Sequence, residues 1–180
     1  MHIAIIYATE EGHTGKIARF VARELTDTGH EVSLFDVDAA EPVTLDQIDA
    51  VILAAPVHQR RHPRSFEATL EAESGPISRR PCLFLSVSLS AAFPEGRDEA
   101  QDYLDEVKMR TGITPSHEAC VAGAIRLGRY DYFAMQVLKL VVLRNRDWDP
   151  SLGNHDFTDW DALKATIAGF LADANRAATR

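Results

Sequence analysis

Apolar runs of strand length alternate along this chain with segments of helical periodicity. The runs are nearly continuous in Val, Ile, Leu and Ala, which is typical of parallel strands covered on both faces. They predict five strands, at residues 2–8, 31–36, 50–55, 81–88 and 119–125. Helical periodicity predicts helices at residues 15–27, 65–73, 95–111 and 159–177. The alternation indicates an α/β fold, a doubly wound parallel sheet with helices on both faces.

Length, charge and cysteine content limit the further possibilities. A chain of 180 residues that is 46% hydrophobic fits one well-buried domain, and no repeat or linker divides residues 1–180. The net charge of −8 argues against nucleic-acid binding, which relies on Lys and Arg. The first residues lack a signal-peptide pattern, so we expect a cytoplasmic protein. Cys82 and Cys120 lie in apolar runs and are expected as buried small side chains, and no metal-ligand spacing occurs.

A polar turn joins the first predicted strand to the first helix. It consists of Thr9, Glu10, Glu11, Gly12, His13 and Thr14. The first N–H groups of a helix are unpaired and lie at the positive end of its dipole, so they bind phosphate well. Two threonine hydroxyls add donors, and Gly12 lets the backbone approach a ligand closely. We interpret this segment, the phosphate turn, as a phosphate cradle; Thr and Glu are also ordinary residues at helix starts.

The residues that the phosphate turn lacks narrow the choice of ligand. No Gly-Lys-Ser/Thr follows as in a P-loop, and no further glycines make a dinucleotide fingerprint. No Lys or Arg precedes Lys16, so neutral donors would hold the phosphate. These features favour a mononucleotide over a nucleoside triphosphate or NAD.

Two further polar loops follow the third and fourth predicted strands. Because parallel strands end at the same edge of a sheet, these loops should converge with the phosphate turn. A flavin needs one loop for its phosphate and two around its ring. Ordinary connections between strands and helices have a similar composition. The expected ring contacts are Pro56, Val57, His58 and Gln59 in one loop, and Ser86, Val87, Ser88, Leu89, Ser90 and Ala91 in the other.

The phosphate turn resembles the flavodoxin phosphate signature, which has Ser or Thr at each end and Gly in the fourth place. More narrowly, the chain resembles the menaquinone-dependent protoporphyrinogen IX dehydrogenases in FLSVSL at 84–89, VAGAIR at 121–126, Arg129-Tyr130 and TDW at 158–160. This resemblance implies a flavodoxin-like sheet of order 2-1-3-4-5, FMN as cofactor and a long insert after the fifth strand. It also implies oxidation of protoporphyrinogen IX with a quinone as electron acceptor, a step of heme biosynthesis.

The insert corresponds to residues 126–156. Its apolar core of roughly fifteen residues is too short for a transmembrane helix, which needs about twenty. An apolar helical face beside basic residues suits a substrate or the inner face of the cell membrane, with contact through residues 126–146. Packing on the protein's own core or in a homo-oligomer interface is the alternative. The residues of this expected face are Arg126, Arg129, Tyr130, Phe133, Val137, Leu140 and Val141.

The loop after the third strand also carries Arg60 and Arg61. Positive charge beside a flavin would favour its anionic reduced form and so two-electron chemistry at higher potential. Both arginines are equally typical of a solvated surface. Because a flavin carries the chemistry, no catalytic side chain is assigned.

Two other functions stay open. One is a flavodoxin-type electron carrier or another FMN-dependent quinone reductase, which the acidic charge fits. The other is a receiver-like regulatory module, but Ala54-Ala55-Pro56 offers it no phosphoacceptor aspartate.

Overall fold

The computed structural model describes residues 1–125 and 154–178. Its main sheet has five strands in the order β2-β1-β3-β4-β5, and every pairing is parallel. The strands are β1 (His2–Tyr7), β2 (Glu31–Asp36), β3 (Ala50–Pro56), β4 (Cys82–Ser88) and β5 (His117–Ala122). The expected fold class and strand order are therefore confirmed.

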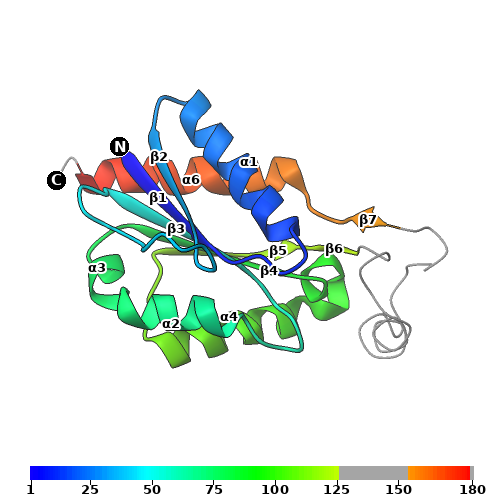
Figure 1. Ribbon diagram of the computed structural model, residues 1–180. Coiled ribbons are helices and arrows are strands. Elements are labelled where there is room, and N and C mark those ends of the chain that lie inside the picture. Colours follow the sequence, from blue (N-terminus) through cyan, green and yellow to red (C-terminus); the bar gives the residue numbers. More distant parts are fainter. Residues whose placement is uncertain (126–153, 179–180) are drawn as a thin grey trace.

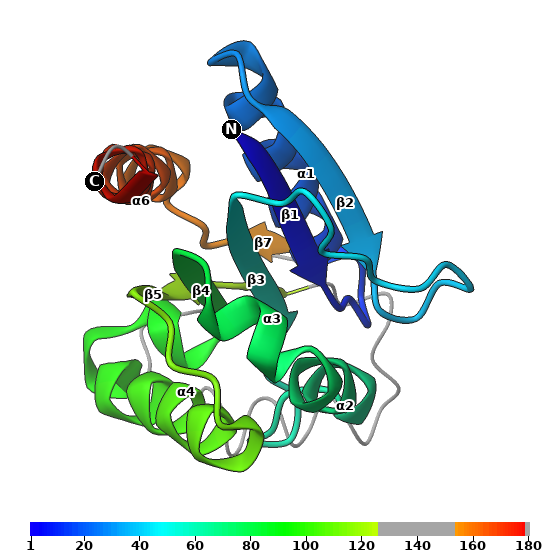
Figure 2. The same cartoon turned by 90° about the vertical axis from the view of Figure 1, so that its left-hand side faces the viewer.

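Helices cover both faces of this sheet (Figure 1 and Figure 2). On one face lie α1 (His13–Asp27) and α6 (Trp160–Ala178), and on the other lie α2 (Arg64–Ala72), α3 (Ser74–Ser78) and α4 (Arg97–Thr111). Two short 3-10 turns, η1 (Ser90–Ala92) and η2 (Pro94–Gly96), connect β4 to α4. Alternate residues of a strand face opposite layers, so Ile5 packs in the α1–α6 core and Ile6 in the α2–α4 core.

The expectation of strands covered on both faces is wrong for β2. This strand lies at the edge of the sheet, its residues are only partly buried or exposed, and Leu34 is 40% exposed. By contrast, every residue of β3 and β4 is buried. An edge strand has a neighbour on one side only, which leaves it open to solvent.

The fifth predicted strand is interrupted. It was expected over residues 119–125, but β5 ends at Ala122 and β6 (Ala124–Ile125) follows after Gly123. The Gly123 N–H donates to the Ser88 carbonyl oxygen at 3.0 Å, and this is the last bond of the parallel ladder. Beyond it, β6 pairs antiparallel with β7 (His155–Asp156) in a separate small sheet. The apolar run hid this change because burial continues through Ile125.

Two helix expectations also need correction. The helix expected over residues 95–111 begins at Arg97, because η2 occupies the residues before it and Gly96 packs against the Ser90 backbone. The first helix begins at His13 rather than residue 15, since the Lys16 N–H already donates to the Gly12 carbonyl oxygen at 3.1 Å. The short helix α3 was not expected.

Both cysteines of the chain are free. Burial raises the pKa of Cys82 to about 12. Burial and nearby acidic groups raise the pKa of the half-buried Cys120 to about 11.

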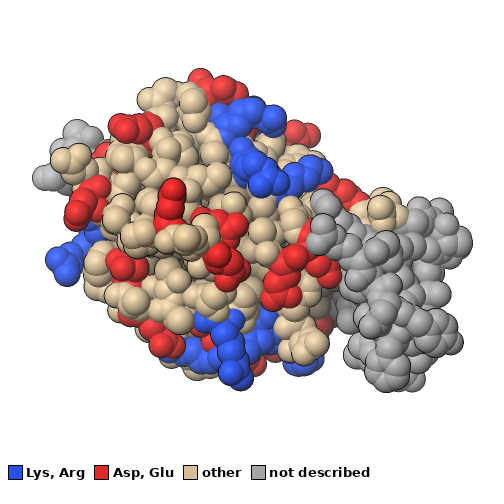
Figure 3. Space-filling model, in the orientation of Figure 1, with Lys and Arg blue, Asp and Glu red and all other residues tan. Residues whose placement is uncertain are grey.

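The surface charges form separate groups. Lys and Arg gather over α1 and over the α2–α4 layer, with Asp and Glu between them (Figure 3). No helix within residues 1–125 and 154–178 is long and apolar enough to cross a membrane.

Candidate functional site

Three loops meet at the carboxyl edge of the sheet because β1, β3 and β4 are neighbours in it. Tyr7 is in register with Ala54, and Pro56 with Val87. The loops that follow these strands are the phosphate turn, a second loop at residues 57–63 and a third at residues 89–93. All three predicted cofactor segments therefore lie at one edge, which is where open α/β sheets bind ligands.

The phosphate turn has the backbone of an anion cradle. Gly12 caps α1 with a φ of 85°, a left-handed conformation that favours glycine. The Thr9 hydroxyl accepts a 3.2 Å hydrogen bond from the Gly15 N–H, so it fixes the shape of the turn from within. Thr14 is only 2% exposed, and it lies in the first turn of α1, where backbone N–H groups have no acceptor within the helix.

These features fit a phosphate group. A buried N–H without an acceptor is costly, and an anion at the helix start supplies one. The left-handed Gly12 has no Cβ to stand in the way of the ligand. The turn itself contains no Lys or Arg, so its donors are neutral.

The second loop contains a strained turn. His58 and Arg61 exchange two backbone hydrogen bonds of 2.9 and 3.0 Å. Between them Gln59 and Arg60 have φ angles of 48° and 65°, the signs that a type I′ turn requires and that residues other than glycine adopt at a cost. The His58 ring lies 3.6 Å from the Glu10 carboxylate, so this loop reaches the phosphate turn.

The third loop is joined to the second through α4. Arg60 donates to Glu99 at 2.7 Å, and the hydroxyl of Ser90 donates to the other oxygen of the same carboxylate at 2.7 Å. The Arg60 guanidinium also lies over the Tyr103 ring, 5.5 Å from its centroid. Burial, together with Glu99, raises the pKa of Tyr103 to about 12, so this phenol stays neutral. The two ring loops are therefore held by one carboxylate.

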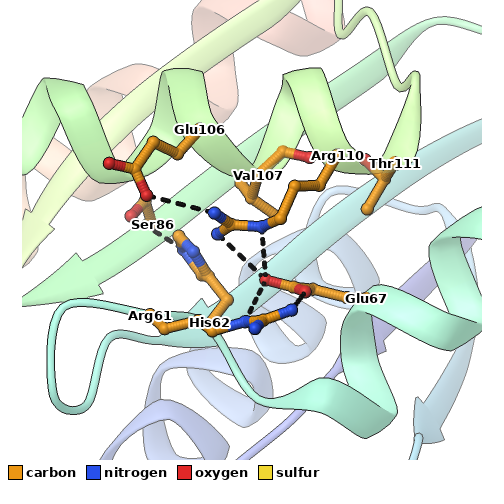
Figure 4. A network of polar contacts seen from close by, with 8 residues as sticks. All are labelled: Arg61, His62, Glu67, Ser86, Glu106, Val107, Arg110 and Thr111. Carbon is orange, nitrogen blue, oxygen red and sulfur yellow. Dashed lines mark hydrogen bonds and ion pairs between the residues drawn. The ribbon is translucent and has the colours of Figure 1, made fainter.

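Beneath these loops a buried carboxylate binds two arginines (Figure 4). Glu67 of α2 is 3% exposed; it pairs with Arg61 and accepts a 3.1 Å hydrogen bond from Arg110 of α4. Burial alone would raise the pKa of Glu67, but the two guanidinium groups lower it below its ordinary value. The two neighbouring arginines therefore have different partners: Arg61 pairs with Glu67 of α2, whereas Arg60 pairs with Glu99 of α4. Their effect on a flavin stays a prediction.

Ser86 and Val87 are expected ring contacts whose side chains the structure places in the core, and Val87 packs in the α1–α6 core. Ser86 lies on the opposite side of the strand. Its hydroxyl lies 3.1 Å from Nε2 of His62, which is 1% exposed and packs against Phe66 and Phe84. Among the described residues, Nδ1 of His62 has no partner. Ser88, in contrast, uses its hydroxyl to accept from the Ala91 N–H at 3.2 Å and so shapes the third loop.

Burial lowers the pKa of His62 from 6.5 to about 4. Between these two values the unfolded chain binds a proton that the folded protein does not, so stability should fall as the pH drops from 6.5 to 4. The loss should reach about 3 kcal/mol and then level off. Urea unfolding across this range should show this loss in the wild type and a smaller loss in His62→Gln, where other titrating groups such as Glu67 remain. Ser86→Ala keeps the titrating ring and should keep the slope; a His62→Gln variant with the wild-type slope contradicts the assignment.

Several residues of the site were not predicted. They are His62, Glu67, Glu99, Asp156 and Thr158. Thr158 belongs to the TDW motif of the resemblance, but neither that motif nor another local pattern predicts their partners, which are distant in the chain. The predicted substrate or membrane face, from Arg126 to Val141, lies outside the described residues. Within residues 1–125 and 154–178, no group of three or more His, Cys, Asp or Glu side chains is arranged to hold a metal.

The fold and this edge define the class of protein. A family model described as a flavodoxin domain matches residues 4–149, most of the chain, so the chain belongs to the flavodoxin family. Among solved structures, a flavodoxin of Fusobacterium nucleatum bound to flavin mononucleotide superimposes with a TM-score of 0.52 at 14% identity, covering 97% of both chains. A short-chain flavodoxin of a bacterial microcompartment gives 0.59 at 13% identity, covering 97% of this chain and 99% of the other.

Two curated relatives carry the name of one particular protein of this class. Protoporphyrinogen IX dehydrogenase [quinone] of Escherichia coli strain K12 is 25% identical over 164 residues, 91% of each chain. The protein of the same name from Leishmania major is 23% identical over 170 residues, 93% of this chain and 74% of its own length. The resemblance expected from the sequence is therefore confirmed.

Proposed function

We propose that the protein is an FMN-dependent oxidoreductase. The observation that carries this proposal is the start of α1, where the buried Thr14 follows the left-handed Gly12 at the edge where two further loops converge. Membership of the flavodoxin family and the likeness to an FMN-bound flavodoxin support the same cofactor. Bound FMN would supply the redox chemistry, and the chain's own residues would bind it, orient it and limit access of water.

The specific reaction that we propose is oxidation of protoporphyrinogen IX to protoporphyrin IX with a quinone as acceptor. The names of the relatives from Escherichia coli and Leishmania major support it, as each covers more than nine-tenths of this chain. The oxidation would proceed in two-electron steps. Each of these steps removes two electrons and two protons from the substrate and converts one quinone to its quinol. Residues 126–141 are the proposed face for the substrate or for peripheral contact with a membrane.

A flavodoxin-type electron carrier is the second candidate. The net charge of −8 favours it, because an acidic carrier docks on a basic reductase. The two candidates differ in the electron donor that they accept.

An anaerobic experiment separates these candidates. Protein reconstituted with FMN is mixed with protoporphyrinogen IX, and flavin absorbance is followed before and after a quinone is added. We expect the flavin to be reduced by the substrate, reoxidised by the quinone, and fluorescent protoporphyrin to accumulate. A flavin that the substrate never reduces, but that a flavodoxin reductase does, contradicts the dehydrogenase and supports the carrier.

The charge of the second loop should affect the flavin potential. Arg60→Glu reverses a charge at the ring loops and should lower the two-electron potential by roughly 30 mV, since it destabilises the anionic reduced flavin. Arg61→Glu should lower the potential too, since each arginine is paired with one carboxylate, Arg60 with Glu99 and Arg61 with Glu67. Spectroelectrochemistry measures both. Arg79→Glu, which changes the residue that ends α3, is the matched control and should leave the potential unchanged. An unchanged potential in Arg60→Glu would assign this arginine to the solvated surface.

A further inference from the structure

The segment that leads into α6 is bound to the first turn of α1, although the two are far apart in sequence. Nε2 of His13 lies 2.8 Å from the hydroxyl of Thr158. That hydroxyl donates its own proton to the Ala122 carbonyl oxygen at 2.7 Å. The hydrogen bond from His13 must therefore run from its Nε2–H to Thr158. Thr158 thus fixes the first residue of α1 to the end of β5.

Asp156 makes a second connection to the same helical turn. One of its oxygens accepts from Lys16 at 2.7 Å, and the other accepts from the Thr158 N–H at 3.0 Å and lies 3.6 Å from Nε2 of His13. Burial raises the pKa of Asp156, but the hydrogen bonds from Lys16 and Thr158 lower it below its ordinary value, so the group is ionised. Lys16 also lies 4.6 Å from the centre of the Trp160 ring. The charge of Lys16 is therefore already engaged by this segment.

These contacts hold His13 and Lys16 in the first turn of α1, beside the backbone N–H groups that would bind the phosphate. His13 is the first residue of α1 and is 7% exposed, so its ring cannot move without moving the turn. We propose that Thr158 and Asp156 are positioning residues for the phosphate of the cofactor. They act through His13 and Lys16 and keep the start of α1 in the orientation that binds the anion. This inference rests on the proposed FMN-binding function.

Comparison of FMN with riboflavin tests it, because riboflavin has the same ring and no phosphate. The affinity of the full chain for each is measured by quenching of flavin fluorescence. Thr158→Val removes the hydroxyl with little change in shape, and should weaken FMN binding about ten-fold while riboflavin binding changes less than about two-fold. Thr158→Ser keeps the hydroxyl and should keep the wild-type FMN affinity.

Asp156→Asn distinguishes positioning from simple charge repulsion. If Asp156 acted only as a negative charge near the phosphate, its neutralisation would strengthen FMN binding. Positioning predicts the opposite sign, a loss of about three-fold, because Lys16 and His13 are released. Lys164→Met is the matched control: it breaks a 2.7 Å ion pair with Glu24, which also joins α6 to α1, and should leave both affinities unchanged.

Equal weakening of FMN and riboflavin in Thr158→Val would show a general structural role and overturn the proposal. So would unchanged FMN affinity in Thr158→Val, or tighter FMN binding in Asp156→Asn. A wild-type protein that binds neither flavin contradicts the proposed function itself, and the inference falls with it.

Discussion

Gly12→Val should abolish tight FMN binding while the protein still folds. Gly12 has a φ of 85°, a conformation that valine adopts only with strain, so the turn must change shape to relieve it. We expect the affinity for FMN to fall by about 100-fold or more, because the N–H groups lose their common orientation. The free energy of unfolding without cofactor should fall by only about 1–3 kcal/mol. Fluorescence titration and urea unfolding measure the two quantities.

Gly29→Val separates backbone strain from the loss of the ligand site. Gly29 has the same φ of 85°, lies just beyond the other end of α1, and has nothing within 4 Å of the position that a Cβ would take. Its substitution should lower stability by a similar amount and leave FMN affinity unchanged. Wild-type affinity in Gly12→Val would place the phosphate elsewhere.

Gly96→Ala should strongly destabilise the protein at η2, which connects the third loop to α4. A Cβ on Gly96 would lie 2.2 Å from the Ser90 carbonyl oxygen, and backbone cannot yield as a flexible side chain can. We expect a loss of about 3 kcal/mol or more in the free energy of unfolding. The third loop must shift to relieve the contact, so FMN and riboflavin should both bind more weakly. Urea unfolding and the two flavin titrations measure these effects.

Gly169→Ala is the control for that substitution. Gly169 lies inside α6 with nothing within 4 Å of its Cβ position, so alanine should raise stability by about 1 kcal/mol through helix propensity. A Gly96→Ala variant as stable as the wild type would contradict the tight approach of η2 to Ser90.

The features that could be predicted from the sequence are those with a local cause. The strands β1, β3 and β4 stand out because both of their faces are buried, so their apolar residues are continuous. The phosphate turn is recognisable because a strand, a glycine and a helix start follow one another within a few residues. Parallel pairing then places the other two loops beside it without further information.

The features that could not be predicted depend on distant partners. β5 ends at Ala122 beside the end of its partner β4 at Ser88, and an apolar run does not record where a partner strand ends. Asp156 falls at the end of the expected insert, residues 126–156, whereas it binds Lys16 in the first turn of α1. Arg60 and Arg61 were expected as similar residues, but their partners Glu99 and Glu67 give them different surroundings.

A crystal structure of the FMN-saturated protein would locate the cofactor directly. We expect phosphate density within hydrogen-bond distance of the N–H groups of Gly12 and Thr14. We also expect the flavin ring between the loop at residues 57–61 and the loop at residues 89–93. Density for FMN at any other edge of the sheet, or a phosphate that makes no contact with the phosphate turn, would contradict this placement.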